Sequence, residues 1–351
     1  MSKAAELAAL IGSQTALSNR NLIINGAMKV AQRGTSSTGL HDSGYYTVDR
    51  YSLIFGNEDE LRVTMTQNSV TDLAGFANSL KVQTTTAESA IAADESYYII
   101  NRYEGQDFQQ LKYGTSNALS TTLSFYVKSS VTGTFAVAIY QTDGNDIIGS
   151  TYTINSADTW ERKTITFAGN TLAAIVDDNT NAIMIDWFLA AGSNFTSVNN
   201  TSWGGYETGK LAYGHGTNAV ATTTNATWEI TGVQWELGEQ ATPFEHRSFA
   251  DELRRCQRYF FRTGAFSFYP VVRWNSDAGR PLTQYNMPVT MRAAPSVSIS
   301  TSFTSGQYYS GTPEFGDQNV NNFYIMSSQT SASAGTIYYL HSGVLDITAE
   351  L

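Results

Sequence analysis

Aromatic residues in two glycine-rich segments are the side chains best suited to bind a ligand. Flat rings stack on the apolar C–H faces of sugars, and a few polar neighbours fix the orientation of the bound ring. The segments 202–215 and 305–316 carry such rings between glycines and serines. Aromatic residues in such segments also pack on neighbouring strands or on other subunits, so both roles stay open. The candidate glycan-binding residues are Trp203, Tyr206, Tyr213, Tyr308 and Tyr309.

Residues for catalysis or metal binding show no comparable grouping. The four histidines are scattered without the spacing of metal ligands. Asp186 and Glu207 are acids of the kind that a glycosidase pairs at roughly 5 to 10 Å, but nothing in the sequence places them together. A Gly-x-Ser-x-Gly motif and a phosphate-binding loop are both missing. We therefore expect a protein that is not an enzyme and that has no catalytic or metal-ligating residues.

Two short turns, 143–146 and 177–179, are rich in oxygen ligands. Ca²⁺ is held by carboxylate and carbonyl oxygens, and both turns supply them. Their spacing fits no complete calcium loop, so solvated turns are the simpler interpretation. A structural Ca²⁺ is the one cofactor that the sequence leaves open.

The composition excludes several classes of partner. The formal net charge is −10 without any basic run, so neutralisation of phosphates cannot supply affinity for nucleic acid. No apolar stretch approaches the roughly 20 residues of a membrane-spanning helix. The first ten residues lack the apolar core and the cleavage site of a secretion signal. A single cysteine, Cys256, excludes an intrachain disulfide. We expect a protein made in a cytoplasm, without membrane insertion.

Strand patterns dominate the chain from Asn21 onward. Many segments alternate apolar and polar residues, as Leu123, Phe125 and Val127 do with the residues between them. So many strands without intervening helices predict an all-β fold, a jelly-roll β-sandwich. The expected strands of the sandwich are 21–26, 47–55, 61–67, 79–85, 96–103, 119–129, 134–141, 147–154, 160–168, 181–190 and 226–237.

Two short helices interrupt this pattern. The first covers residues 2–11 and is too short to be stable alone, so we expect it to become ordered by docking. The second covers 248–261, where Ser248 and Asp251 have the spacing of a capping box. We interpret this second helix as a linker between domains. Its expected apolar face carries Phe249, Leu253, Cys256 and Phe260.

These elements divide the chain into four parts. Residues 1–20 form the N-terminal helix and a polar tether, 21–247 the jelly roll, 248–261 the linker helix, and 262–351 a smaller C-terminal β-domain. Strands of the last part are expected at 266–274, 287–292, 296–302, 323–328 and 336–346.

Several residues have a structural interpretation. In the Asn25-Gly26 turn signal we expect Gly26 to supply a positive φ. Asp49 beside Arg50 suits charge-assisted anchoring of loops. The segment 242–247 is expected to fix the last strand of the sandwich to the linker helix. Three tryptophans lie within strand patterns and are expected in the core, namely Trp160, Trp187 and Trp228.

Three segments also stand in a distinctive order along the chain. They are Asn21-Leu-Ile-Ile-Asn-Gly-Ala-Met-Lys-Val-Ala-Gln-Arg-Gly34 with Tyr46-Thr-Val-Asp-Arg-Tyr51, Thr231-Gly-Val-Gln-Trp-Glu-Leu-Gly238 with Ala241-Thr-Pro-Phe-Glu-His-Arg-Ser248, and Glu252-Leu-Arg-Arg-Cys-Gln-Arg-Tyr-Phe260. Together they resemble the modular tail-fibre and virion proteins of tailed phages that carry a carbohydrate-binding-module-like jelly roll. The resemblance covers residues 21–261 and makes a cyanophage a candidate source. It implies a galactose-binding-like sandwich whose first and last strands carry the first two segments, and it implies no particular ligand.

The resemblance implies a virion structural protein, a tail-fibre subunit that attaches the particle to its host. With the aromatic candidates above, we expect the partner to be host surface polysaccharide. Phage fibres commonly have threefold symmetry, which predicts a homotrimer whose weak sites gain avidity. The N-terminal helix would dock on other virion proteins through Leu7, Leu10 and Ile11. Two alternatives stay open. One is a capsid-decoration, head-fibre or tail-adaptor protein that stabilises the particle without receptor binding, and the less favoured one is a polysaccharide depolymerase.

Overall fold

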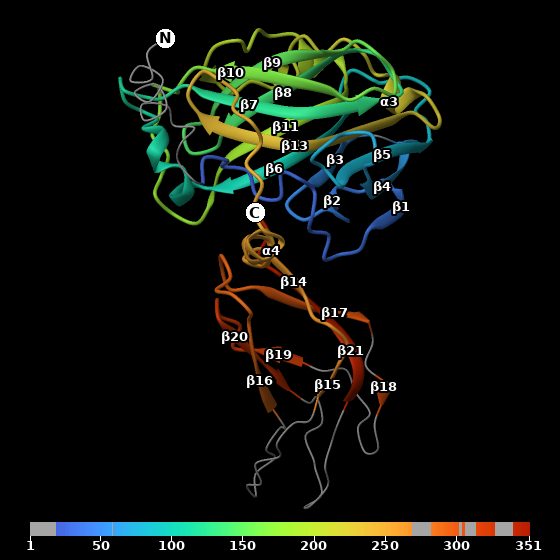
Figure 1. The fold of residues 1–351 in the computed structure, drawn as a ribbon, viewed down its shortest axis with the longest axis vertical. Helices are drawn as coiled ribbons and strands as arrows, with labels where there is room; N and C mark the ends of the chain where they lie inside the picture. Colours follow the sequence, from blue (N-terminus) through green and yellow to red (C-terminus); the bar gives the residue numbers. More distant parts are fainter. Residues whose placement is uncertain (1–18, 58, 269–281, 302–303, 306–313, 327–339) are drawn as a thin grey trace, which may run out of the picture. The chain divides into compact units, whose positions relative to one another are not determined.

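A computed structural model describes residues 19–57, 59–268, 282–301, 304–305, 314–326 and 340–351 (Figure 1). The chain divides into two compact units, residues 1–252 with Leu351 and residues 253–350. Among the described residues no helix is long and apolar enough to cross a membrane. The N-terminal helix and its docking residues Leu7, Leu10 and Ile11 lie outside the described ranges.

The first unit is a sandwich of two antiparallel sheets, between which the chain crosses repeatedly in the manner of a jelly roll. The predicted fold class is confirmed. Sheet A has the order β1 (Ser36–Leu40), β4 (Arg62–Ser69), β5 (Asn78–Thr86), β13 (Thr227–Leu237), β7 (Thr121–Ser129) and β10 (Glu161–Phe167). Sheet B has the order β12 (Gly204–Gly205), β9 (Asp146–Ile154), β8 (Gly133–Gln141), β11 (Asn181–Ala191), β6 (Ser96–Glu104), β3 (Ser52–Gly56) and β2 (Gly44–Tyr45).

The core lies between the two sheets and follows the period-2 alternation of the strands. Leu123, Phe125 and Val127 of β7 point into it, as the alternation predicts. The ring of Phe125 meets that of Trp187 from the opposite sheet, with centroids 6.3 Å apart. Trp187 and Trp228 are fully buried, as predicted.

A long segment between β11 and β13 packs on the outer face of sheet B. We call residues 192–218 the strap. Its backbone is hydrogen-bonded to the sheet, because Gly149 N donates to Asn200 O at 2.8 Å and Tyr206 N donates to Asn145 O at 2.7 Å. A side chain at Gly149 would collide with the amide of Asn200, so the strap lies directly on the strand at this point. The single-turn helices in the described part of this unit are η2 (Gly105–Asp107), η3 (Gln109–Leu111), α2 (Ser193–Thr196), η4 (Thr208–Lys210) and α3 (Ala219–Thr222).

The first expected strand, 21–26, is wrong, because this segment forms turns. The left-handed backbone conformation of the turn falls on Asn25, with φ 61°, rather than on Gly26. Glycine is needed at position 26 for a different reason, since a Cβ there would collide with the carbonyl oxygen of Val233. The expected strand 47–55 is likewise shorter and begins only at Ser52.

The linker helix is α4 (Phe249–Gln257) and is shorter than expected. The predicted cap is confirmed, because Asp251 N donates to Ser248 Oγ at 3.1 Å and Ser248 Oγ donates to the Asp251 carboxylate at 2.6 Å. The expected apolar face is wrong in part. Phe249 is 55% exposed, whereas the charged Glu252 is buried.

The described residues of the second unit form two small sheets around a core of their own. On one sheet β21 (Leu340–Thr348) pairs with β14 (Phe260–Arg262), β15 (Phe266–Phe268), β17 (Ser296–Thr301) and β18 (Thr304–Ser305), and the other has the order β16 (Leu282–Asn286), β20 (Asn322–Met326), β19 (Glu314–Gly316). The core contains Met291, Phe323, Ile325, Leu345 and Ile347. The expected strand 287–292 is not formed.

Replacing Gly26 by alanine tests the close approach at the first turn. We expect Gly26→Ala to lower the free energy of unfolding by about 1–3 kcal/mol, because a backbone carbonyl cannot move aside for the added methyl group. The control is Gly205→Ala, since a Cβ at Gly205 has no neighbour within 4 Å. Urea unfolding of both variants gives the comparison, and equal stability of the two would contradict the packing described here.

Candidate functional site

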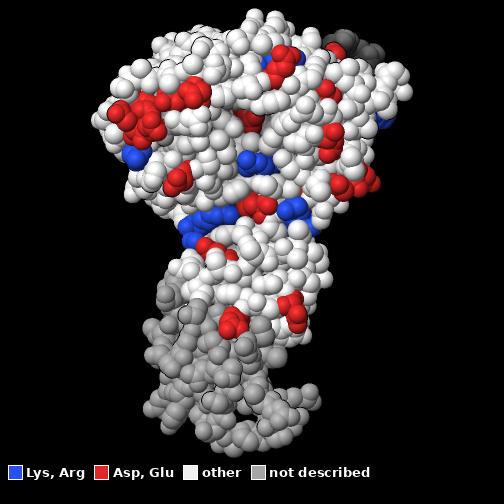
Figure 2. All heavy atoms as spheres, turned by 180° about the vertical axis from the view of Figure 1, so that it is seen from behind, with Lys and Arg blue, Asp and Glu red and all other residues white. Residues whose placement is uncertain are grey.

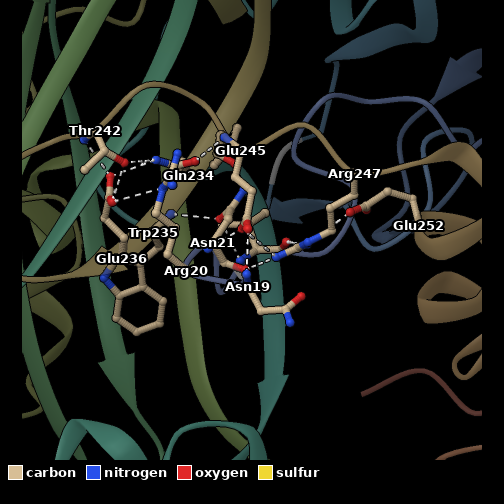
Figure 3. A network of polar contacts seen from close by, with 12 residues as sticks. Asn19, Arg20, Asn21, Gln234, Trp235, Glu236, Thr242, Glu245, Arg247 and Glu252 are labelled. Carbon is tan, nitrogen blue, oxygen red and sulfur yellow. Dashed lines mark hydrogen bonds and ion pairs between the residues drawn. The ribbon is translucent and has the colours of Figure 1, made fainter. Parts of the chain in front are cut away.

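The beginning and the end of the sandwich are joined by a network of charged and amide groups that we call the clasp (Figure 3). Glu245 accepts hydrogen bonds from the backbone N–H groups of Asn19 at 2.6 Å and Asn21 at 2.8 Å. The guanidinium of Arg247 donates to the carbonyl oxygens of Asn21 and Ile23 and pairs with Glu252 at 3.0 Å. Three of the segments that carry the family resemblance therefore meet here.

The clasp continues along β13 through side chains of the last strand. Glu236 accepts from the Thr242 backbone N–H at 2.9 Å and from the Thr242 hydroxyl at 2.6 Å. Gln234 accepts from Glu245 N at 2.7 Å and donates to Glu236 at 2.8 Å. Because the carboxylates of this network already accept hydrogen bonds from the chain itself, the clasp is a structural device rather than a ligand site.

The outer face of sheet A is also occupied by the protein itself. Glu229 is buried there and accepts from Ser79 at 2.9 Å and Asn68 at 3.1 Å, with Lys81 and Lys128 at 3.6 and 3.8 Å. Farther along the same face, the ring of Phe76 packs against the rings of three residues. These are Tyr126, Phe244 and His246, with centroids 5.1–5.3 Å from that of Phe76.

Trp160 lies at the edge of this face and not in the core, contrary to the sequence prediction. Its indole N–H donates to Asp72 at 2.8 Å, and the ammonium of Lys128 lies 4.8 Å from the centroid of the indole ring. The sequence suggested a strand beginning at position 160, but β10 begins only at Glu161, so Trp160 belongs to the turn before it.

The outer face of sheet B gathers three tyrosines around an acid and a base, which we call the Asp186 cluster. It consists of Tyr98 and Arg102 from β6, Tyr140 from β8, Asp186 from β11 and Tyr206 from the strap. The rings of Tyr140 and Tyr206 lie 5.0 Å apart, and Tyr98 stacks on Phe188 at 4.7 Å. The three tyrosines and Arg102 each keep part of their surface accessible.

Asp186 has the most unusual environment in this cluster. It is only 3% exposed and lies opposite Ile100 on one side and Ala138 on the other. Its Oδ1 is fully buried without a hydrogen-bond partner among the described residues. Burial raises the pKa of this carboxyl to about 7, although the nearby Arg102 pulls it in the opposite direction.

Arg102 lies beside Asp186 but forms no ion pair with it. The two side chains share the outer face, because Arg102 lies opposite Met184 and Asp186 lies two residues farther along the same strand. The guanidinium donates to the hydroxyl of Tyr45 at 3.3 Å. A desolvated carboxylate without donors and a guanidinium with free donors are thus presented together, next to aromatic rings.

The structure places the predicted glycan-binding residues in different surroundings. Tyr206 belongs to the Asp186 cluster, whereas Trp203 packs against the main core and donates its indole N–H to Ala168 O at 2.6 Å. Tyr213 is half-buried in the strap. Tyr308 and Tyr309 lie outside the described residues.

The sequence interpretation missed Tyr98, Tyr140 and Arg102, and it considered Asp186 only as half of a catalytic pair. Glu207, the other half, is 60% exposed and pairs with Lys210 at 2.8 Å. A signal was present in the alternation, since positions 98, 140 and 186 lie on the outward side of otherwise apolar strands. Only the strand order brings them together.

In each turn considered for Ca²⁺, at least one carboxylate accepts hydrogen bonds from the protein itself. Asp143 accepts from Val176 N at 2.8 Å, and Asp178 accepts from the backbone and hydroxyl of Thr180 at 2.8 and 2.7 Å. Within the described part of the chain, no group of three or more His, Cys, Asp or Glu could hold a metal ion. On the face drawn in Figure 2, acidic side chains form one larger group at the upper left and otherwise lie apart, and basic side chains form smaller groups.

Comparison with known proteins gives structural likenesses but no sequence relative. No protein-family model matches the sequence, and no curated protein matches it. The enzymatically active domain of tailspike protein 4 from bacteriophage CBA120 is similar at 12% identity and a TM-score of 0.34, over 62% of this chain and 22% of that one. The family 11 carbohydrate-binding module of a Clostridium thermocellum cellulase is similar at 12% identity and a TM-score of 0.29, over 59% of this chain and 98% of that one. TmCBM61, solved with β-1,4-galactotriose, is similar at 9% identity and a TM-score of 0.29, over 63% and 100%. Because these TM-scores lie well below 0.5, we base neither fold nor function on them.

Removal of the clasp arginine should destabilise the sandwich strongly. We expect Arg247→Ala to cost about 3–5 kcal/mol, because it removes the charged partner of the buried Glu252 carboxylate and the side-chain donor of the carbonyl groups of residues 21 and 23. Glu207→Gln, at the exposed ion pair with Lys210, should change stability by less than about 1 kcal/mol. Similar unfolding curves for both variants would show that the clasp contributes little.

The buried acid predicts a pH-dependent stability. The ordinary pKa of aspartate is 3.8 and that of Asp186 in the folded protein is about 7, so the folded state binds more protons than the unfolded state between these values. The contribution of Asp186 is therefore fully present below about pH 4 and is lost as the pH rises through 7. The stability of Asp186→Asn relative to the wild type should increase by on the order of 2–4 kcal/mol between pH 4 and pH 8. Denaturant unfolding at both pH values measures this, with Asp42→Asn, at an 82% exposed side chain, as the control. A pH-independent difference would exclude a raised pKa.

Proposed function

We propose that this chain is a virion structural protein of a tailed phage, a tail-fibre subunit that binds a host surface glycan on the outer face of sheet B. The observation that carries the proposal is the Asp186 cluster, in which three partly exposed tyrosines surround a carboxylate without donors and an available guanidinium. The placement in a phage particle rests on the resemblance of the three segments within residues 21–261.

The chemistry of the cluster suits a sugar better than other ligands. A sugar ring offers an apolar C–H face to the tyrosine rings and hydroxyl groups to the charged side chains. Proteins bind such molecules with apolar and aromatic surfaces that carry a small number of placed polar groups. The net charge of −10 adds no attraction for polyanions.

Binding without catalysis is part of the proposal. Hydrolysis of a glycoside uses two carboxyl groups held across the scissile bond. Glu207, the acid considered as the partner of Asp186, is exposed and already paired with Lys210. We therefore assign to the cluster a role in attachment, with a homotrimer and an N-terminal virion contact through Leu7, Leu10 and Ile11 as further parts of the proposal.

Cell binding by the purified protein tests this function. We expect saturable binding of the labelled protein to host cells, lost in the presence of competing host polysaccharide. Tyr206→Ala and Tyr140→Ala should each weaken binding about 2- to 10-fold, given the roughly 0.5–1.5 kcal/mol of an aromatic contact. Trp160→Ala, on the opposite sheet, is the matched control. Absence of binding by the folded oligomer would favour a capsid-decoration or tail-adaptor protein instead.

A further inference from the structure

The surroundings of Asp186 and Arg102 restrict the chemical class of sugar that could bind beside them. A buried carboxylate normally has hydrogen-bond donors, because an unsatisfied charged acceptor carries a large desolvation penalty. Glu229 and Glu252 of the same sandwich follow this rule. Asp186 does not, because its Oδ1 is buried without a hydrogen-bond partner among the described residues, and its strand neighbours Ile100 and Ala138 are apolar.

Arg102 does not supply the hydrogen bond that the Asp186 carboxylate lacks. Arg102 acts on Asp186 only through its charge, and no hydrogen bond joins the two side chains. Its Nη1 donates to the Tyr45 hydroxyl at 3.3 Å, which leaves other N–H groups of the planar guanidinium for a partner. An acceptor-only group and a donor-only group therefore lie side by side without satisfying each other.

We propose that Asp186 and Arg102 together select a neutral sugar ring with two adjacent hydroxyl groups, one donating to Asp186 and the other accepting from Arg102. This inference rests on the proposed function and adds the class of sugar. Adjacent hydroxyls of a pyranose are each donor and acceptor, so one ring satisfies both side chains. The rings of Tyr206 and Tyr140 lie in the same cluster, where they can contact its C–H face.

An acidic sugar fits this arrangement less well. A ligand carboxylate could pair with Arg102, but it would bring a second negative charge to Asp186 and no donor for its oxygen atoms. The ionisable groups of the cluster are Arg102 and Tyr98 from β6, Tyr140 from β8 and Tyr206 from the strap. Burial raises the pKa of Tyr98 and of Tyr140, so both stay neutral near pH 7 and supply no positive charge for the anion.

A panel of defined oligosaccharides tests the proposal by titration calorimetry on the full chain. The probes are neutral gluco-, galacto- and manno-configured oligosaccharides, together with the matching uronic-acid oligomers. We expect at least one neutral series to bind about 10-fold or more tightly than its uronate counterpart, and Asp186→Asn to lose about 10- to 100-fold, as for the loss of a hydrogen bond to a charged group. Affinity of the wild type should rise from pH 5.5 to 8.5, as Asp186 ionises, and should stay flat in Asp186→Asn.

Two variants separate this proposal from the more general one. Arg102→Gln removes the charge and most of the N–H donors of the guanidinium, so an unchanged affinity for the preferred neutral oligosaccharide would overturn the role of the guanidinium. Equal binding of neutral and uronate probes, both abolished by Tyr206→Ala, would leave glycan binding intact and refute the selection by charge. Tighter binding of uronates than of the matching neutral sugars at pH 8.5, where Asp186 is ionised, would refute it as well. If neither the panel nor host polysaccharide binds, both proposals fail.

Discussion

Each central strand of the sandwich has two faces, and only one of them can enter the core that the sheets share. This constraint sets the rest of the structure, because residues such as Phe125 and Trp187 fill the interior while their neighbours in sequence must point outward. Both outer faces are then partly covered. On sheet A, the Glu229 network and the ring of Phe76 do so, and on sheet B the strap lies across β8, β9 and β11.

The outer faces of the two sheets differ in the hydrogen-bond donors that they offer to a buried acid. On sheet A, Glu229 has hydroxyl and amide donors and two ammonium groups nearby, so its ionised form is well solvated by the protein. On sheet B, Asp186 sits beside Ala136, Ala138 and Phe188 without a donor. Burying Asp186 without hydrogen-bond donors costs folding free energy. In proteins, such local energetic costs concentrate at sites that bind or react.

Much of the fold could be predicted from the sequence, because alternation reports which side of a strand is buried. The strands β6 to β11 were predicted nearly to their ends for this reason. The prediction failed where apolar residues do not alternate, as in Asn21–Gly26, where Asn21 N donates to Glu245 of the clasp and single backbone hydrogen bonds join Leu22 and Gly26 to β13 without forming a strand. Trp160 was misplaced because hydrophobicity alone does not distinguish a core ring from one held at an edge by Asp72 and Lys128.

The candidate site was less accessible to sequence analysis than the fold. Tyr98, Tyr140 and Asp186 come from strands that are distant in the chain and become neighbours only through the strand order β8-β11-β6. Tyr206 was found because its glycine-rich surroundings indicated a loop. The segments that resemble phage virion proteins instead meet mainly at the clasp, and the Asp186 cluster contains none of their residues. The resembling segments therefore join the beginning and the end of the sandwich. The class of ligand has to be inferred from other side chains, those of the Asp186 cluster.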